Sequence, residues 1–115
     1  MTEPIALCPS GEIGENESRG FTPSINGSPY PVFAVRKNGQ LVAYRNLCPH
    51  AYIPLEWVPD EFLTSDKSLI QCANHGALFT LDTGECVAGP CPGQSLQAVE
   101  ISESDGTVYL QTANL

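Results

Sequence analysis

Short runs of alternating apolar and polar residues, separated by glycine and proline, extend along the chain. The clearest runs are residues 31–36 and 41–46, which lie on either side of an Asn-Gly pair at 38–39. Asn-Gly accepts the positive φ angles of a tight β-turn. Residues 96–101 and 107–112 form a similar pair around a Ser-Asp-Gly turn. The pattern therefore predicts two β-hairpins.

Weaker patterns predict further short strands at residues 5–7, 21–25, 68–71 and 78–81. Pro23 interrupts the second of these and favours an edge position, because proline cannot donate to a sheet. Residues 57–63 fit one helical turn, and residues 10–18 and 85–93 are expected to be loops. Ten glycines and ten prolines leave little room for long helices, so an all-β fold is predicted.

The length of 115 residues predicts a single domain, residues 1–115. Its strand-rich ends, about 1–46 and 95–115, are expected to form a β framework. A loop-rich insert, about 47–94, lies between them. The formal net charge of −8 argues against binding to nucleic acid or to an anionic membrane. It suits docking on a basic patch of a protein partner.

The beginning of the chain is acidic and is followed by no apolar segment of the kind found in targeting sequences. No apolar run is long enough to span a bilayer. A cytoplasmic location is therefore expected. In that compartment, the five cysteines are not expected to form a disulfide framework.

Two short motifs carry the candidate chemistry: Cys48-Pro49-His50 and Cys72-Ala73-Asn74-His75. Each supplies one thiolate and one imidazole within a tight loop, and together they contain both histidines of the chain. Two cysteines and two histidines can bind a zinc ion. They can also bind a [2Fe–2S] cluster, in which the thiolates hold one iron and the imidazoles the other.

The chain resembles the Rieske [2Fe–2S] family, in its ferredoxin-like, low-potential branch. The resemblance lies in Cys48-Pro49-His50, Cys72-Ala73-Asn74-His75-Gly76 with Phe79, Asp82-x-Gly84-Glu85, and Gly89-Pro90-Cys91-Pro92. It implies an antiparallel β-sandwich base with a loop-rich cluster-binding insert. It also implies that Cys48 and Cys72 bind the inner iron, and that His50 and His75 bind the outer iron. The interval from His50 to Cys72 is longer than is usual in this branch, with the extra residues expected within 56–68.

The resemblance also bears on the reduction potential. The high-potential branch has a disulfide between the two ligand loops, but the matching positions here are Ile53 and Asn74. It also has a serine and a tyrosine that donate to sulfur, where this chain has Ala77 and Phe79. Fewer donors stabilise the reduced state less. We therefore expect a potential near the low end of the Rieske range, about −150 mV.

Cys86 and Cys91 are not expected to bind iron. A disulfide between them would close a short loop, whereas a cytoplasmic location favours reduced thiols.

The implied function is transfer of one electron, between a flavin-dependent reductase and a terminal oxygenase. The chain has no motif for a small-molecule substrate, and no histidine remains for a mononuclear iron site. It is therefore expected to be an electron carrier and not itself an enzyme. Two alternatives are a small Rieske subunit of a larger reductase, such as assimilatory nitrite reductase, and a zinc-stabilised binding module.

Overall fold

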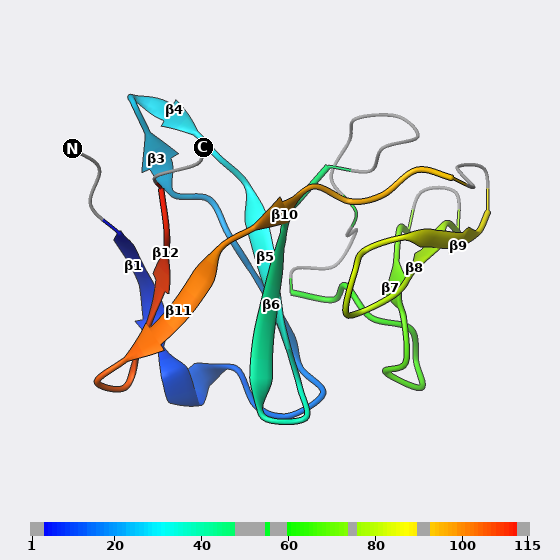
Figure 1. Ribbon diagram of the computed structural model, residues 1–115, viewed down its shortest axis with the longest axis horizontal. Helices are drawn as coiled ribbons and strands as arrows, with labels where there is room; N and C mark the ends of the chain where they lie inside the picture. The colour runs from blue at the N-terminus through cyan, green and yellow to red at the C-terminus, as the bar shows by residue number, and fades with distance from the viewer. Residues whose placement is uncertain (1–3, 48–54, 56–59, 74–75, 90–92, 113–115) are drawn as a thin grey trace.

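The computed structural model describes residues 4–47, 55, 60–73, 76–89 and 93–112. Within these ranges the regular structure consists of short β-strands and one 3-10 turn, Ser10–Glu12. Every named strand pairing is antiparallel. The predicted all-β class is thus confirmed (Figure 1).

Two sheets make up most of the framework. Sheet A contains, in spatial order, β1 (Ile5–Pro9), β12 (Thr107–Leu110) and β11 (Ile101–Ser104). Sheet B contains, in spatial order, β10 (Ala98–Val99), β6 (Gln40–Arg45), β5 (Val32–Lys37) and β2 (Ser18–Phe21). The chain passes from sheet B to sheet A at Glu100, between β10 and β11.

Sheet D is a smaller sheet on the other side of sheet B from sheet A (Figure 1). Its strands, in spatial order, are β7 (Ile70–Gln71), β8 (Leu78–Phe79) and β9 (Cys86–Ala88). Sheet C is a separate two-stranded ribbon that consists of β3 (Ser24–Ile25) and β4 (Ser28–Pro29).

The alternation of side chains along β5 explains why sheet B is the central layer. Phe33 and Val35 belong to the core on the side of sheet D, whereas Val32 and Ala34 belong to the core shared with sheet A. Successive residues of a strand point to opposite faces, so β5 is buried on both faces. The ring of Phe33 stacks on that of Phe62, with centroids 4.3 Å apart.

The two predicted hairpins are present. β5 and β6 pair across Asn38 and Gly39, which have φ angles of 55° and 76°. β11 and β12 pair across Asp105 and Gly106, which also have positive φ. The second hairpin is shorter than expected, because its first predicted strand is divided between β10 in sheet B and β11 in sheet A.

Three local predictions are wrong. Residues 21–25 do not form one strand, because the chain leaves sheet B after Phe21 and enters the β3–β4 ribbon beyond Pro23. The helical turn expected over 57–63 is absent from its described part, residues 60–63, where Asp60 has a φ of 66°. The loop expected over 85–93 contains β9, which pairs with β8.

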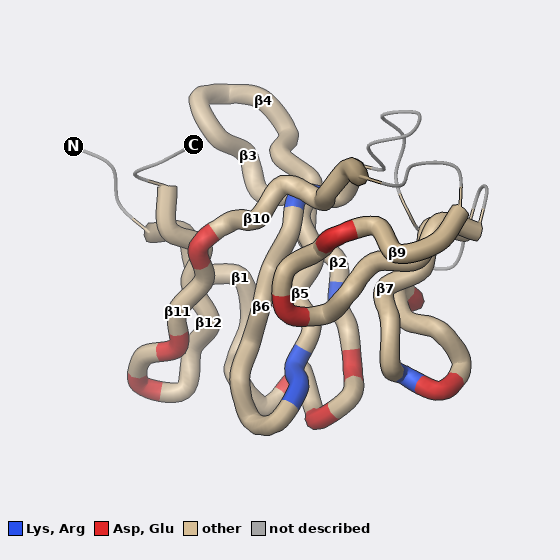
Figure 2. Tube along the Cα trace, turned by 45° about the vertical axis from the view of Figure 1, so that its right-hand side comes forward, with Lys and Arg blue, Asp and Glu red and all other residues tan. Residues whose placement is uncertain are grey.

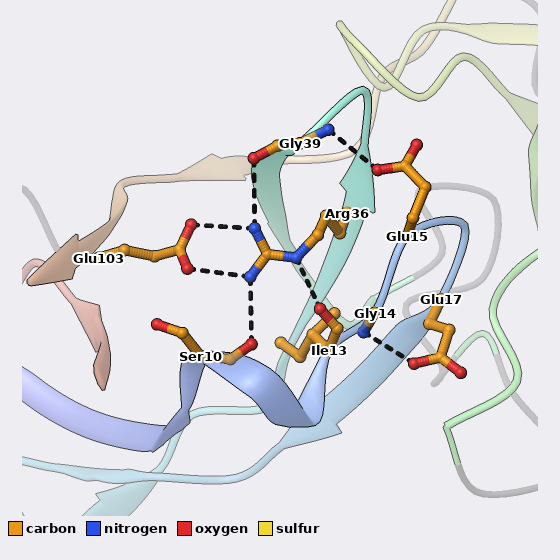
Figure 3. Close-up of polar contacts among 8 residues, drawn as sticks. All are labelled: Ser10, Ile13, Gly14, Glu15, Glu17, Arg36, Gly39 and Glu103. Carbon is orange, nitrogen blue, oxygen red and sulfur yellow. Dashed lines mark hydrogen bonds and ion pairs between the residues drawn. The ribbon is translucent and has the colours of Figure 1, made fainter. Parts of the chain in front are cut away.

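Sheets A and B are joined by Arg36, at the end of the apolar part of β5 (Figure 3). Its guanidinium donates to both carboxylate oxygens of Glu103 on β11, at 3.1 and 2.9 Å. It also donates to the backbone carbonyls of Ser10, Ile13 and Gly39. The hydrogen bonds to Arg36 lower the pKa of Glu103. Arg36 thus satisfies carbonyls that strand pairing leaves open.

Residues 60–62, at the start of the segment 60–70, are hydrogen-bonded to β2, the outer strand of sheet B. The Asp60 carboxylate accepts a hydrogen bond from the Gly20 amide at 2.8 Å, and the Ser18 hydroxyl donates to the Asp60 carbonyl at 2.7 Å. Leu63 and Ile70 are paired as an isolated bridge, so the segment folds back on itself. This is the part of the chain in which the extra residues of the insert were expected.

Acidic positions are spread along the described trace, at turns of both the framework and the sheet D region (Figure 2). None of the described segments forms a helix with the length and apolar character that a bilayer crossing needs.

Candidate metal centre

Of the four predicted ligands, the structure describes Cys72. Cys48, His50 and His75 lie outside the described residues, as does Cys91. Cys72 directly follows β7, and its side chain is fully buried in the core between sheets B and D. Cys72 is grouped there with buried apolar side chains, and none of its own surface is exposed.

Cys72 begins a closed turn between β7 and β8. Its amide donates to the carbonyl of Ala77 at 2.9 Å, and its carbonyl accepts a hydrogen bond from the Gly76 amide at 2.9 Å. Gly76 has a φ of 73°, which is readily accessible to glycine. The loop predicted to carry His75 is therefore closed at its base by backbone hydrogen bonds.

The ends of the other predicted ligand loop are held together by Asn46 and Leu55. Asn46 directly follows β6, and its side-chain oxygen accepts a hydrogen bond from the Leu55 amide at 2.9 Å. The carbonyl of Leu55 in turn accepts a hydrogen bond from the Ala73 amide at 2.8 Å. The two residues that flank Cys48 and His50 in sequence are thus bonded to each other and to the neighbour of Cys72.

The start of the glycine-proline segment lies against the turn that contains Cys72. A Cβ atom at Gly89 would come within 2.6 Å of the Ala77 Cα atom, closer than a real Cβ contact allows. Gly89 also has a φ of 99°, in the region that favours glycine. Only a residue without a side chain therefore fits between these two backbones.

Tyr44 fixes sheet D to sheet B. Its hydroxyl donates to the Leu81 carbonyl at 3.0 Å. A Cβ atom at Gly84 would come within 2.7 Å of the Tyr44 ring, so the ring packs directly on the glycine. Burial raises the pKa of Tyr44 to about 12. The turn between β8 and β9 is thereby held against the framework.

The described residues fit an iron–sulfur cluster in two respects. A buried thiol can bind iron as thiolate, and two other segments reach the turn 72–77. Leu55 accepts a hydrogen bond from the Ala73 amide, and Gly89 lies so close to the Ala77 backbone that only glycine fits. Ala77 and Phe79, fully buried beside this turn, have no hydroxyl group to donate to sulfur. Among the described residues as a whole, no three His, Cys, Asp or Glu residues are grouped to hold a metal ion.

A surface hollow of about 580 Å³ lies between β2 and residues 60–67, and none of the described residues that line it is a predicted ligand. The sequence did not identify Asn46, Leu55 or Tyr44 as parts of the site, whereas Gly89 belongs to one of the motifs that carry the family resemblance. The other three act through contacts between segments, which the order of residues does not reveal.

Comparison with known folds gives similar structures of two kinds. The chain is 21% identical to the ferredoxin of carbazole 1,9a-dioxygenase from Nocardioides aromaticivorans IC177, with a TM-score of 0.73, covering 95% of this chain and 97% of the ferredoxin. It is 22% identical to the terminal oxygenase of carbazole 1,9a-dioxygenase from Novosphingobium sp. KA1, with a TM-score of 0.77. That alignment covers 98% of this chain and 30% of the oxygenase. At this identity the likeness establishes the fold.

A third similar structure is described as a complex of reduced oxygenase and oxidized ferredoxin in carbazole 1,9a-dioxygenase. The matched chain is 21% identical, with a TM-score of 0.72, covering 93% of this chain and 91% of that one. No curated protein sequence matches the chain. The sequence model of the Rieske [2Fe-2S] domain family, however, matches residues 3–109. This chain therefore belongs to the Rieske [2Fe-2S] domain family.

Proposed function

We propose that this chain carries one electron on the [2Fe–2S] cluster of its family, between a reductase and a terminal oxygenase. The observation that carries the proposal is the match of the Rieske family over residues 3–109. It also makes a zinc-stabilised module a poor description of the chain. The chain acts as a component of an oxidoreductase system, without a catalytic site of its own.

The ligands in this proposal are Cys48 and Cys72 for one iron and His50 and His75 for the other. Such a cluster, when bound, accepts and releases a single electron. The described residues support the assignment, because hydrogen bonds through Leu55 bring the ends of the first loop to the turn that begins at Cys72. Residues 47–94 then form the cluster-binding insert, within a single domain of residues 1–115.

The partners we propose are proteins. One solved structure with this fold is a complex of a ferredoxin with the oxygenase of carbazole 1,9a-dioxygenase, and this chain has nearly the same extent as such a ferredoxin. The net charge of −8 suits association with a basic surface and disfavours nucleic acid and anionic membranes. A cytoplasmic location is proposed with it, and Cys8, buried and outside any disulfide, agrees with a reducing compartment.

A second candidate is a Rieske component within a larger enzyme. It is favoured by the TM-score of 0.77 to a terminal oxygenase, of which the chain covers 30%. A small subunit of a reductase is the other form of this candidate. A free carrier binds its partners transiently, whereas a subunit or domain of a larger enzyme is permanently attached to the rest of that enzyme. Size-exclusion chromatography of native extract, followed through the Rieske signal, separates a free carrier from a permanent subunit.

The decisive experiment is purification without oxygen, followed by analysis of iron, acid-labile sulfide and zinc. We expect two irons and two sulfides per chain, because the family cluster is [2Fe–2S]. We also expect a Rieske electron paramagnetic resonance (EPR) signal after reduction with dithionite. Electron transfer is then followed optically with a flavin reductase and a terminal oxygenase. Folded protein with one zinc and no iron would overturn the proposal.

A further inference from the structure

We infer that Asn46 is a positioning residue for the cluster, whose side chain closes the first ligand loop and joins it to the second. The inference rests on the proposed ligand set of Cys48, His50, Cys72 and His75. Asn46 itself is not a ligand in this proposal. It would act by fixing where the two loops begin and end.

The burial of Asn46 points to a specific role. Among the described residues, Asn46 is the one with a side-chain amide or charged group that is buried, at 7% exposure. A buried polar group is costly unless it is hydrogen-bonded, so such a residue is kept where its bonds are needed. Its side-chain oxygen accepts a hydrogen bond from the Leu55 backbone amide, and its own backbone amide donates to the Pro31 carbonyl at 2.9 Å.

The bond to Leu55 spans nine residues of sequence, and these residues contain the first ligand motif. A side-chain acceptor at position 46 therefore sets the distance between the two ends of that loop. Leu55 is fully buried, so its amide cannot turn to water if the acceptor is removed. Loss of the Asn46 oxygen would leave this donor unsatisfied and release the end of the loop.

Leu55 connects its hydrogen bond with Asn46 to the second ligand loop. The Leu55 carbonyl accepts a hydrogen bond from the Ala73 amide, and Ala73 is joined to Cys72 by its peptide bond. Asn46 lies two residues before Cys48. A path of hydrogen bonds thus runs from the framework at Pro31 through Asn46 and Leu55 to Ala73, the neighbour of Cys72. Partners outside the metal ligands that orient them can change metal affinity by 10–100-fold.

The test compares Asn46→Leu, which has similar size but no acceptor, with Asn46→Asp, which keeps one. Cluster loss is followed as the decay of visible absorbance with an iron chelator present. We expect N46L to lose its cluster at least about tenfold faster than the wild-type protein. N46D should retain its cluster at close to the wild-type rate. It should also have a lower reduction potential, because a negative charge nearby opposes the added electron.

Val108→Ala is the matched control for general loss of stability. Val108 is fully buried in the core shared by sheets A and B, away from Cys72. We expect V108A to lower the free energy of unfolding without the tenfold change in cluster loss. Asn46→Ala takes the place of N46L if the latter does not fold.

Two failures are distinguishable. If N46L and V108A lose their clusters at equal rates for equal loss of stability, Asn46 has no positioning role. If N46D loses its cluster as fast as N46L, the acceptor oxygen is not what matters. Both results leave the proposed function intact. Wild-type protein without iron and sulfide would instead remove the proposed function, on which the inference rests.

Discussion

The Tyr44 hydroxyl donates to the Leu81 carbonyl across 3.0 Å, joining the central sheet to the turn between β8 and β9. Tyr44 belongs to β6, in the hairpin of β5 and β6, whereas Leu81 lies in the turn that connects two strands of sheet D. This contact therefore holds the turn between β8 and β9 against the framework, close to the turn that begins at Cys72.

Tyr44→Phe removes this hydrogen bond and keeps the ring. We expect the free energy of unfolding to fall by about 1 kcal/mol, the usual net value of one hydrogen bond. Because burial raises the pKa of Tyr44 to about 12, its contribution is fully present below the unfolded pKa near 10. It is lost as pH rises toward 12. Urea unfolding should show this alkaline loss in wild-type protein and less of it in Y44F; equal losses would contradict the assignment.

Gly89→Ala places a methyl group where the Ala77 backbone lies, 2.6 Å away. We expect faster cluster loss and a free energy of unfolding lower by about 2 kcal/mol or more, from strain and displacement of the segment. Gly93→Ala is the control, since Gly93 also has positive φ but nothing lies within 4 Å. Cluster decay and urea unfolding of both variants check this. Equal decay of the two would mean that strain alone accounts for the effect.

His50→Ala and His75→Ala each remove one proposed iron ligand. We expect both proteins to contain little iron or an unstable cluster, because the chain has no third histidine to replace the lost one. Iron and sulfide analysis with EPR measures this. Cys8→Ala, in the core on the far side of sheet B, should keep its cluster. A normal Rieske signal in either histidine variant would refute the ligand set.

The reduction potential should be near −150 mV, the low end of the Rieske range, at about neutral pH. The structural reason is that the buried side chains of Ala77 and Phe79 offer no hydroxyl donor to sulfur. Voltammetry of the protein on an electrode measures it directly. A clearly positive value would show that other donors replace the missing hydroxyls.

Glu103→Gln weakens the contact with Arg36 that joins the two main sheets. We expect a loss of about 1 kcal/mol of stability at neutral pH. The pKa of Glu103 is lowered, chiefly by its hydrogen bonds to Arg36, so the ionised form stabilises the fold. This contribution is present above the unfolded pKa of about 4.3 and disappears as pH falls through the lower folded value.

The difference in free energy of unfolding between wild-type protein and E103Q should therefore shrink below about pH 4. Unfolding by urea from pH 7 down to pH 3 measures it. Glu61→Gln, at an exposed position of the 60–70 segment, is the control and should behave like wild-type protein. A difference that stayed constant with pH would show that the charge of Glu103 contributes nothing.

The sequence allowed the hairpin of β5 and β6 to be predicted because its signals are local: alternation on both sides of Asn38 and Gly39. It did not allow β9 to be predicted. Cys86–Ala88 is bordered by glycine and proline, and its strand character comes from pairing with β8 through an irregular register. Similarly, Asp60 follows Pro59 as a helix start would, but its carboxylate is bonded to the distant Gly20.

For the candidate site, the sequence predicts ligands because Cys and His at short spacing have few other roles, and the four named residues stay a prediction. The family match now supports that interpretation. Asn46 could not be singled out, because its importance depends on burial and on an amide nine residues away. In the sequence Tyr44 is one residue of an alternating strand, and its role depends on a hydrogen bond to the distant Leu81 carbonyl.

The contact between Asp60 and Gly20 has a consequence for behaviour at high concentration. An outer strand with open amides invites another chain to add a strand of its own, which is a common route to aggregation. On β2 the Gly20 amide is already bonded to the Asp60 carboxylate, and the Ser18 hydroxyl is bonded to Asp60 and to the Phe62 amide. Residues 60–62 thus cover part of the outer edge of β2, which disfavours self-association through this strand.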